Sequence, residues 1–134
     1  MKIYRPVSLI LTILFAITGL LFLFIPGRVL TLFNNMSPAF HLPESPVTGF
    51  SFYLILAVGY MYLVTVLAFL MYRNPENKNF PLLLSHGKIA SSLLSLGLFV
   101  FHAHYLIYIT NFVIDGIIGI IVTIFYTRIE KTGP

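Results

Sequence analysis

Long apolar stretches without a charged residue dominate this chain of 134 residues. Residues 7–25 and 50–72 contain no Asp, Glu, Lys or Arg, and each is long enough to cross the roughly 30 Å hydrocarbon core of a bilayer as a helix. Only 9% of the residues are charged, against about 25% in an average soluble domain. A soluble domain of this size could not hide so much apolar surface, so these numbers exclude a soluble enzyme and predict an integral membrane protein.

A third apolar region, residues 82–126, is too long for a single crossing, because one helix of that length would reach about 67 Å. We therefore expect a hairpin of two helices. Its turn could lie at 102–105, the most polar interruption, or at 110–111. The first position is favoured because it gives two spans of nearly equal length, 82–101 and 106–126.

These spans predict an all-α fold, a four-transmembrane-helix bundle that forms a single membrane domain over residues 1–134. Pro26 and Gly27 should stop the first span. Residues 26–49 are expected to form the outer loop, with a short interfacial segment at 28–33 and irregular, proline-rich chain after it.

Basic residues cluster on one side of this arrangement. Six of them fall beside the termini or in the connection between the second and third spans, against one, Arg28, on the other side; the six are Lys2, Arg5, Arg73, Lys78, Arg128 and Lys131. The positive-inside rule then predicts that both termini are cytoplasmic, and we expect a multi-pass protein of a bacterial-type inner (cytoplasmic) membrane. The net charge of +4 is thus a topology signal and not a nucleic-acid site.

Only two formal charges, Lys88 and Asp115, fall inside the expected spans. An ionisable group at membrane depth is costly and is a functional candidate by default. The two residues could pair across neighbouring antiparallel helices, although helical side chains tilt toward their own N-terminus and so point these two apart. With the turn at 110–111, both would be interfacial anchors. A structural use is favoured over a ligand-binding or proton-linked role.

Polar neighbours accompany these two charges. Asn111 precedes Asp115 by one turn, while Ser92, Ser95 and His102 follow Lys88 at helical spacing. Two such stripes could satisfy each other's hydrogen bonds, or could hold the polar head of a quinone, a lipid or a small metabolite. The candidate ligand-binding residues are therefore Asp115, Asn111, Lys88, Ser92 and Ser95.

The remaining chemistry is sparse. The chain has no cysteine, which excludes disulfides and thiolate metal sites. His41, His102 and His104 are weak metal candidates because imidazole suits zinc or copper, but no spaced carboxylate joins them, so packing or hydrogen bonding is favoured. No phosphate-binding loop, H-E-x-x-H motif or nucleophile elbow is present. We expect no catalytic residue set and no cofactor, unless a quinone or lipid binds.

The glycine-bearing first span ITGLLFLFIP, its stop at Pro26, the loop before the second span and the basic tail resemble the small four-helix bacterial membrane proteins grouped as DoxX-like, and the related DUF4345-type chains. The resemblance implies a four-helix architecture. Some DoxX-like proteins are linked to quinone-coupled sulfur oxidation and others to membrane integrity. No functional residue is carried over from it.

The favoured function is a non-catalytic accessory or structural subunit that packs in the lipid bilayer against membrane-protein partners or further copies of itself. The alternative is a quinone-, lipid- or metabolite-binding protein, or a small transporter, with its polar site around Asp115 and Lys88.

Overall fold

The structure, a computed structural model, describes residues 2–49 and 51–132, and every element within them is helical. In chain order the elements are α1 (Tyr4–Phe24), α2 (Pro26–Met36), the 3-10 helix η1 (Ser37–Phe40), α3 (Ser51–Arg73), α4 (Asn79–Phe101) and α5 (Leu106–Thr132). Four of these helices, α1, α3, α4 and α5, are long and apolar enough to cross a membrane. The predicted all-α, four-span architecture is confirmed.

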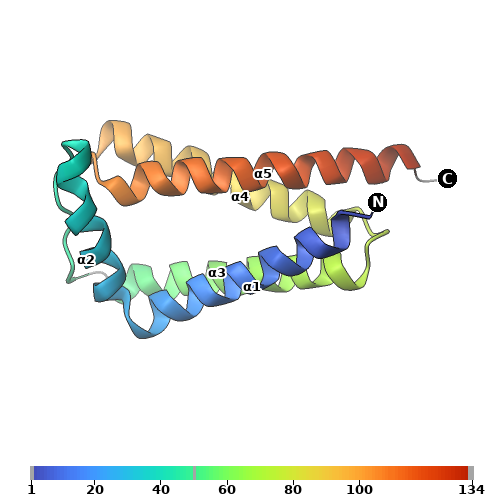
Figure 1. The fold of residues 1–134 in the computed structure, drawn as a ribbon, viewed down its shortest axis with the longest axis horizontal. Coiled ribbons are helices and arrows are strands. Elements are labelled where there is room, and N and C mark those ends of the chain that lie inside the picture. Colours follow the sequence, from blue (N-terminus) through green and yellow to red (C-terminus); the bar gives the residue numbers. More distant parts are fainter. Residues whose placement is uncertain (1, 50, 133–134) are drawn as a thin grey trace.

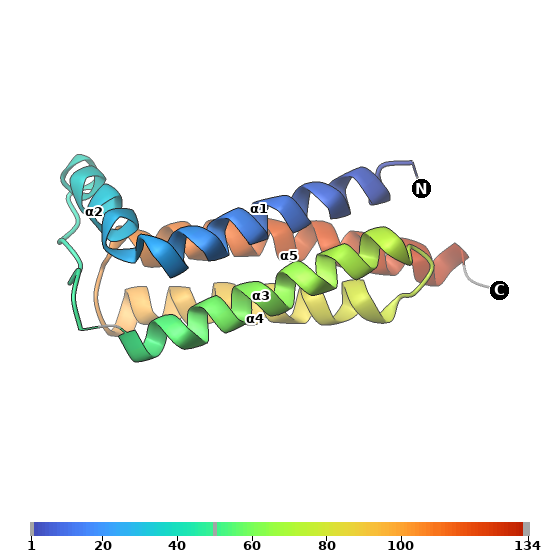
Figure 2. The same cartoon turned by 90° about the horizontal axis from the view of Figure 1, so that it is seen from below.

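The four long helices form two closely packed pairs, α1 with α3 and α4 with α5. The pairs approach each other at the end of the bundle that carries both chain termini and diverge toward the opposite end (Figure 1). There α2 lies across the bundle and contacts both α1 and α5. Figure 2 shows the same arrangement from below, with α3 alongside α4. We call the two ends the terminal end and the α2 end.

The buried hydrophobic core lies in the half of the bundle next to the termini. All four long helices contribute to it, through Tyr4, Leu11, Phe15, Val64, Ala68, Met71, Leu84, Ile118, Val122 and Phe125. Most of these residues come from the part of their helix that is nearer the terminal end, whereas Phe15 and Ile118 lie near the middle of α1 and α5. The core therefore joins the two helix pairs in one half only.

Two glycines allow α5 to approach α4 closely. A Cβ atom at Gly119 would lie 2.9 Å from Cγ1 of Ile89, and one at Gly116 would lie 3.0 Å from Oγ of Ser92. Small residues at such contacts are how helices associate in a medium that supplies no hydrophobic drive between them. The contact fixes the register of the α4/α5 hairpin, whose turn lies at residues 102–105, the favoured of the two positions.

The segment after α1 is more helical than the sequence suggested. Pro26 ends α1 but also begins α2, because proline is favoured in the first turn of a helix, where its missing N–H costs nothing. The expectation of irregular chain directly after residue 33 is wrong, since α2 continues to Met36 and η1 follows. Asn34 then ties the loop down: its Nδ2 donates to the Ser45 carbonyl at 2.9 Å, and its Oδ1 accepts from the Ser45 N–H at 2.8 Å.

Candidate functional site

The two charges inside the expected spans form a buried ion pair between α4 and α5. Nζ of Lys88 lies 2.9 Å from Oδ1 of Asp115, and the two residues are only 2% and 4% exposed. Breaking such a pair on one side leaves an uncompensated buried charge, which is strongly destabilising. The pair therefore ties α4 to α5 in the middle of the bundle.

The register of the hairpin explains how the pair forms against the tilt of the side chains. A Cβ atom at Gly119 would lie 3.6 Å from Cβ of Lys88, so Lys88 is level with Gly119 and one turn away from Asp115. The Cα–Cβ bonds of Lys88 and Asp115 thus point apart along the helix axes, as expected from the tilt of helical side chains. The four-carbon stem of the lysine covers the intervening turn, about 5.4 Å along the helix axis.

The ammonium group of Lys88 also contacts the other helix pair. Nζ lies 4.3 Å from the ring centroid of Phe15 on α1 and 5.2 Å from that of Tyr60 on α3, distances at which a cation is attracted to an aromatic face. The Tyr60 hydroxyl donates to the Gly87 carbonyl on α4 at 3.1 Å. Lys88 is thus placed where all four long helices meet.

The polar stripes of α4 and α5 bind each other. Nδ2 of Asn111 donates to Oγ of Ser95 at 2.6 Å and to Oγ of Ser91 at 3.2 Å. The Ser92 hydroxyl donates to the Phe112 carbonyl at 2.7 Å. All five candidate ligand-binding residues therefore lie in one cluster, whereas His102 is outside it, exposed at the C-terminal end of α4.

One side-chain oxygen of this cluster, Oδ2 of Asp115, has no hydrogen bond within residues 2–49 and 51–132. Lys88 binds only Oδ1 of Asp115, and the Asp115 side chain keeps 6% of its surface exposed. The two charges of the cluster thus pair with each other, and one carboxylate oxygen can still accept a hydrogen bond.

Sequence reasoning missed Phe15 and Tyr60. Phe15 gives no signal, because one phenylalanine among the apolar residues of a span resembles any other. Tyr60 does give one, since tyrosines are enriched at the membrane interfaces and this residue lies inside α3. A phenol hydroxyl at that depth needs a partner, and the Gly87 carbonyl supplies it.

The histidines do not assemble a metal site in the part of the chain that the structure describes, where no group of three or more His, Cys, Asp or Glu side chains could hold a metal ion. His104 packs edge-on against Phe99, with ring centroids 5.1 Å apart. His41 ends η1 with a left-handed backbone, φ 55°.

Comparisons with protein-family models, with curated proteins and with solved structures found no match to this chain.

Proposed function

We propose that this chain is a non-catalytic structural or accessory subunit of a larger complex in a bacterial inner membrane, with both termini cytoplasmic. The observation that carries the proposal is the closed Lys88–Asp115 pair. Intramembrane charges that serve transport commonly lie along a water-filled cavity or pathway. These two are buried between packed helices and bind each other, which supports a structural role.

The outer surface of α1 supports docking of a partner helix. Ile10, Ile13, Leu14 and Ile17 are exposed at the i, i+3, i+4, i+7 spacing of one helix face and, with Thr18, line a shallow apolar groove of about 320 Å³. The Thr18 hydroxyl is bound to the Leu14 carbonyl at 2.8 Å, so the groove presents no free donor. Such a face suits van der Waals packing against a partner's spanning helix.

The test is the mass of the assembly in a mild detergent. We expect the tagged protein to be isolated at a mass well above its own 15.2 kDa, with other subunits or further copies bound. Ile13→Trp in the groove should release them, while the matched Ile120→Trp on the exposed face of α5 should not. A monodisperse single chain, or equal behaviour of the two variants, would contradict the proposal.

A second variant separates the structural role of the ion pair from a chemical one. Replacing both charges, Lys88→Met with Asp115→Leu, removes the pair but keeps the packed volume. The assembly should survive this double substitution if the pair only holds α4 and α5 together. Loss of the assembly from a folded double variant would contradict a pair that only holds α4 and α5 together.

A further inference from the structure

We infer that two copies of this chain associate through the lipid-facing side of α3. The Tyr62 ring of each copy packs over Gly59 of the other copy, and its hydroxyl donates a hydrogen bond to the Gly59 carbonyl there. A two-fold axis along the membrane normal relates the two contacts. This contact lies outside the α1 groove of the proposed function and names a second copy of the chain as the partner.

Tyr62 presents a polar group to lipid in the middle of a span. It lies eleven residues from each end of α3, about 16 Å along the helix axis, and it is 73% exposed. Its hydroxyl has no hydrogen-bond partner among the residues that the structure describes. Hydrocarbon offers no hydrogen-bonding group at this depth, so an unsatisfied hydroxyl there is costly. The position therefore indicates that a protein partner covers Tyr62.

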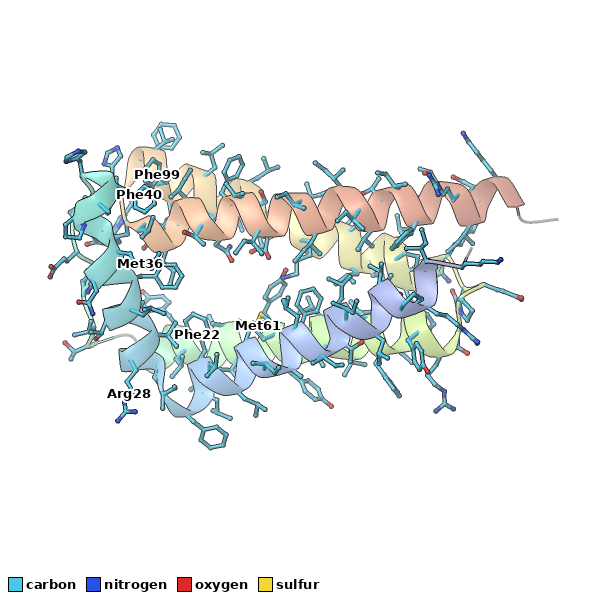
Figure 3. The ribbon with its side chains drawn as sticks, viewed as in Figure 1. Phe22, Arg28, Met36, Phe40, Met61 and Phe99 are labelled. Carbon is cyan, nitrogen blue, oxygen red and sulfur yellow. The ribbon has the colours of Figure 1, made fainter. Side chains whose placement is uncertain are left out.

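The residues next to Tyr62 face their own bundle and satisfy their own polar groups. Met61 packs against α1, where a Cβ atom at Gly19 would lie 3.2 Å from Cβ of Met61 (Figure 3). The Thr65 hydroxyl donates to the Met61 carbonyl of its own helix at 2.6 Å, as threonines in helices commonly do. Tyr62 has no such route, because a rigid ring holds its hydroxyl away from its own backbone. The acceptor must come from another molecule.

The exposed side of α3 has the spacing of a helix–helix contact. Copies of one chain insert with the same orientation, so the α3 helices of two copies are parallel and equal residue numbers lie at equal depth. Parallel helices pack side by side when the contacting residues alternate at intervals of four and three. We call the five residues with this spacing the α3 stripe; four are exposed and Val66 is half-buried: Ile55, Gly59, Tyr62, Val66 and Phe69.

Gly59 supplies both space and an acceptor on this stripe. A Cβ atom there would meet nothing within 4 Å, so the described part of the chain leaves this glycine uncovered, and a partner helix can approach its backbone closely. Helical side chains tilt toward the N-terminus of their helix. The Tyr62 ring of a parallel neighbour therefore leans toward the level of Gly59, one turn away. The second lone pair of the Gly59 carbonyl can accept its hydrogen bond.

The chain already contains one contact of this kind. The Tyr60 ring of α3 lies over Gly87 of α4, with its Cε2 3.7 Å from the position of a Cβ atom at Gly87. The Tyr60 hydroxyl donates to the Gly87 carbonyl at 3.1 Å. Tyr62 over Gly59 of the second copy would repeat this arrangement between molecules. Because the two-fold axis produces the contact twice, neither Tyr62 hydroxyl is left without an acceptor.

Disulfide cross-linking in native membranes tests which face of α3 meets the second copy. The chain has no cysteine, so a single cysteine reports on its own copy. With mild oxidation, Ile55→Cys on the α3 stripe should give a product of twice the chain mass of 15.2 kDa. Leu56→Cys is the matched control, also exposed but about 100° around the helix. It should give little product, because its Cα would lie farther from its copy than the roughly 7 Å that a disulfide spans. Equal cross-linking of the two variants, or none, would overturn the inference.

Two substitutions test the contact itself. Energy transfer between labelled copies of the purified chain in lipid vesicles measures the dimer. Gly59→Leu should weaken it at least about tenfold by filling the space above the glycine, whereas Gly97→Leu, at a glycine of α4 that also has nothing within 4 Å, should leave it unchanged. Tyr62→Phe keeps the ring and should weaken the dimer by about tenfold, because two interhelical hydrogen bonds are lost. An unchanged dimer in folded Gly59→Leu or Tyr62→Phe would overturn the inference.

Ile13→Trp separates this contact from docking at α1. Ile13 lies in the α1 groove and not on the α3 stripe, so Ile13→Trp should release partners bound at α1 and leave the dimer intact. A dimer that Ile13→Trp dissociates and Gly59→Leu does not would overturn the α3 contact while supporting docking at α1. Loss of partners from neither variant, with a dimer that depends on Gly59, would contradict the proposed function alone.

Discussion

Lys88 reaches one full turn along α5 to meet Asp115, because its own Cβ lies level with Gly119. The aliphatic part of the lysine side chain therefore lies between α4 and α5. Its ammonium contacts the rings of Phe15 and Tyr60, which belong to the other helix pair. One long side chain thus connects the close α4/α5 contact to the contact between the pairs. The stability of both contacts should respond to changes at this pair.

Removing one charge of the pair should destabilise the protein more than removing both. Asp115→Asn leaves the Lys88 ammonium buried without its counter-ion, and the free energy of unfolding should fall by about 3–5 kcal/mol. The double variant Lys88→Met with Asp115→Leu should lie within about 1 kcal/mol of the parent or above it, because apolar replacements of similar volume remove the desolvation cost. Unfolding by titration with a denaturing detergent measures both, and similar losses in the two variants would contradict a structural pair.

The close approach of α5 to α4 makes Gly119 intolerant of any side chain. In Gly119→Ala the new methyl group would meet Cγ1 of Ile89 at 2.9 Å and the backbone N of Ile89 at 3.4 Å, so the helices must separate, at a cost of about 1–3 kcal/mol. Adding Ile89→Ala should recover part of the loss by removing the nearer atom. Gly97→Ala has nothing within 4 Å and should change stability by less than about 0.5 kcal/mol. The same detergent titration compares the three variants.

The spans, the α4/α5 turn and the polar neighbours of Asp115 follow from the sequence because they depend on local pattern. The length of an apolar run limits the number of crossings, and helical spacing places Asn111 one turn from Asp115. The pairing of Lys88 with Asp115 depends on the register of two helices, which Gly116 and Gly119 set through contacts with Ser92 and Ile89. Contacts of that kind join residues far apart in the chain, so no local pattern predicts them.

The same limit applies to the other half of the cluster and to α2. Phe15 and Tyr60 become partners of Lys88 only because the helix pairs converge at the terminal end. The residues after Pro26 mix apolar and polar side chains over a short stretch, and this pattern is compatible with either a loop or a helix. The hydrogen bonds between Asn34 and Ser45, which link the end of α2 to the following loop, again join positions that helical periodicity does not relate.

Two tyrosines should respond in opposite directions to loss of the hydroxyl. In the part of the chain that the structure describes, the Tyr4 hydroxyl is the one fully buried side-chain polar atom without a hydrogen-bond partner. Tyr4→Phe keeps the edge-on ring contact with Phe125, with centroids 5.1 Å apart, and should raise the free energy of unfolding by about 1 kcal/mol or more. Tyr60→Phe removes the bond to the Gly87 carbonyl and should lower it by about 0.5–1.5 kcal/mol. Thermal melts in one detergent compare the two, and a lower midpoint for Tyr4→Phe would show that its hydroxyl is satisfied.

The distribution of basic residues predicts which side of the membrane each connection occupies. Because the chain has no cysteine, single cysteines can report on this directly. Glu44 lies in the loop between η1 and α3, and Glu76 in the connection between α3 and α4; both are exposed. Six basic residues lie beside the termini and the α3/α4 connection, and one lies on the α2 side. A membrane-impermeant maleimide should therefore label Glu44→Cys in intact spheroplasts, and Glu76→Cys only after permeabilisation. Glu130→Cys, near the end of α5, should behave like Glu76→Cys, because an even number of spans places both on the same side. Labelling of Glu76→Cys but not of Glu44→Cys in intact spheroplasts would show the inverse topology.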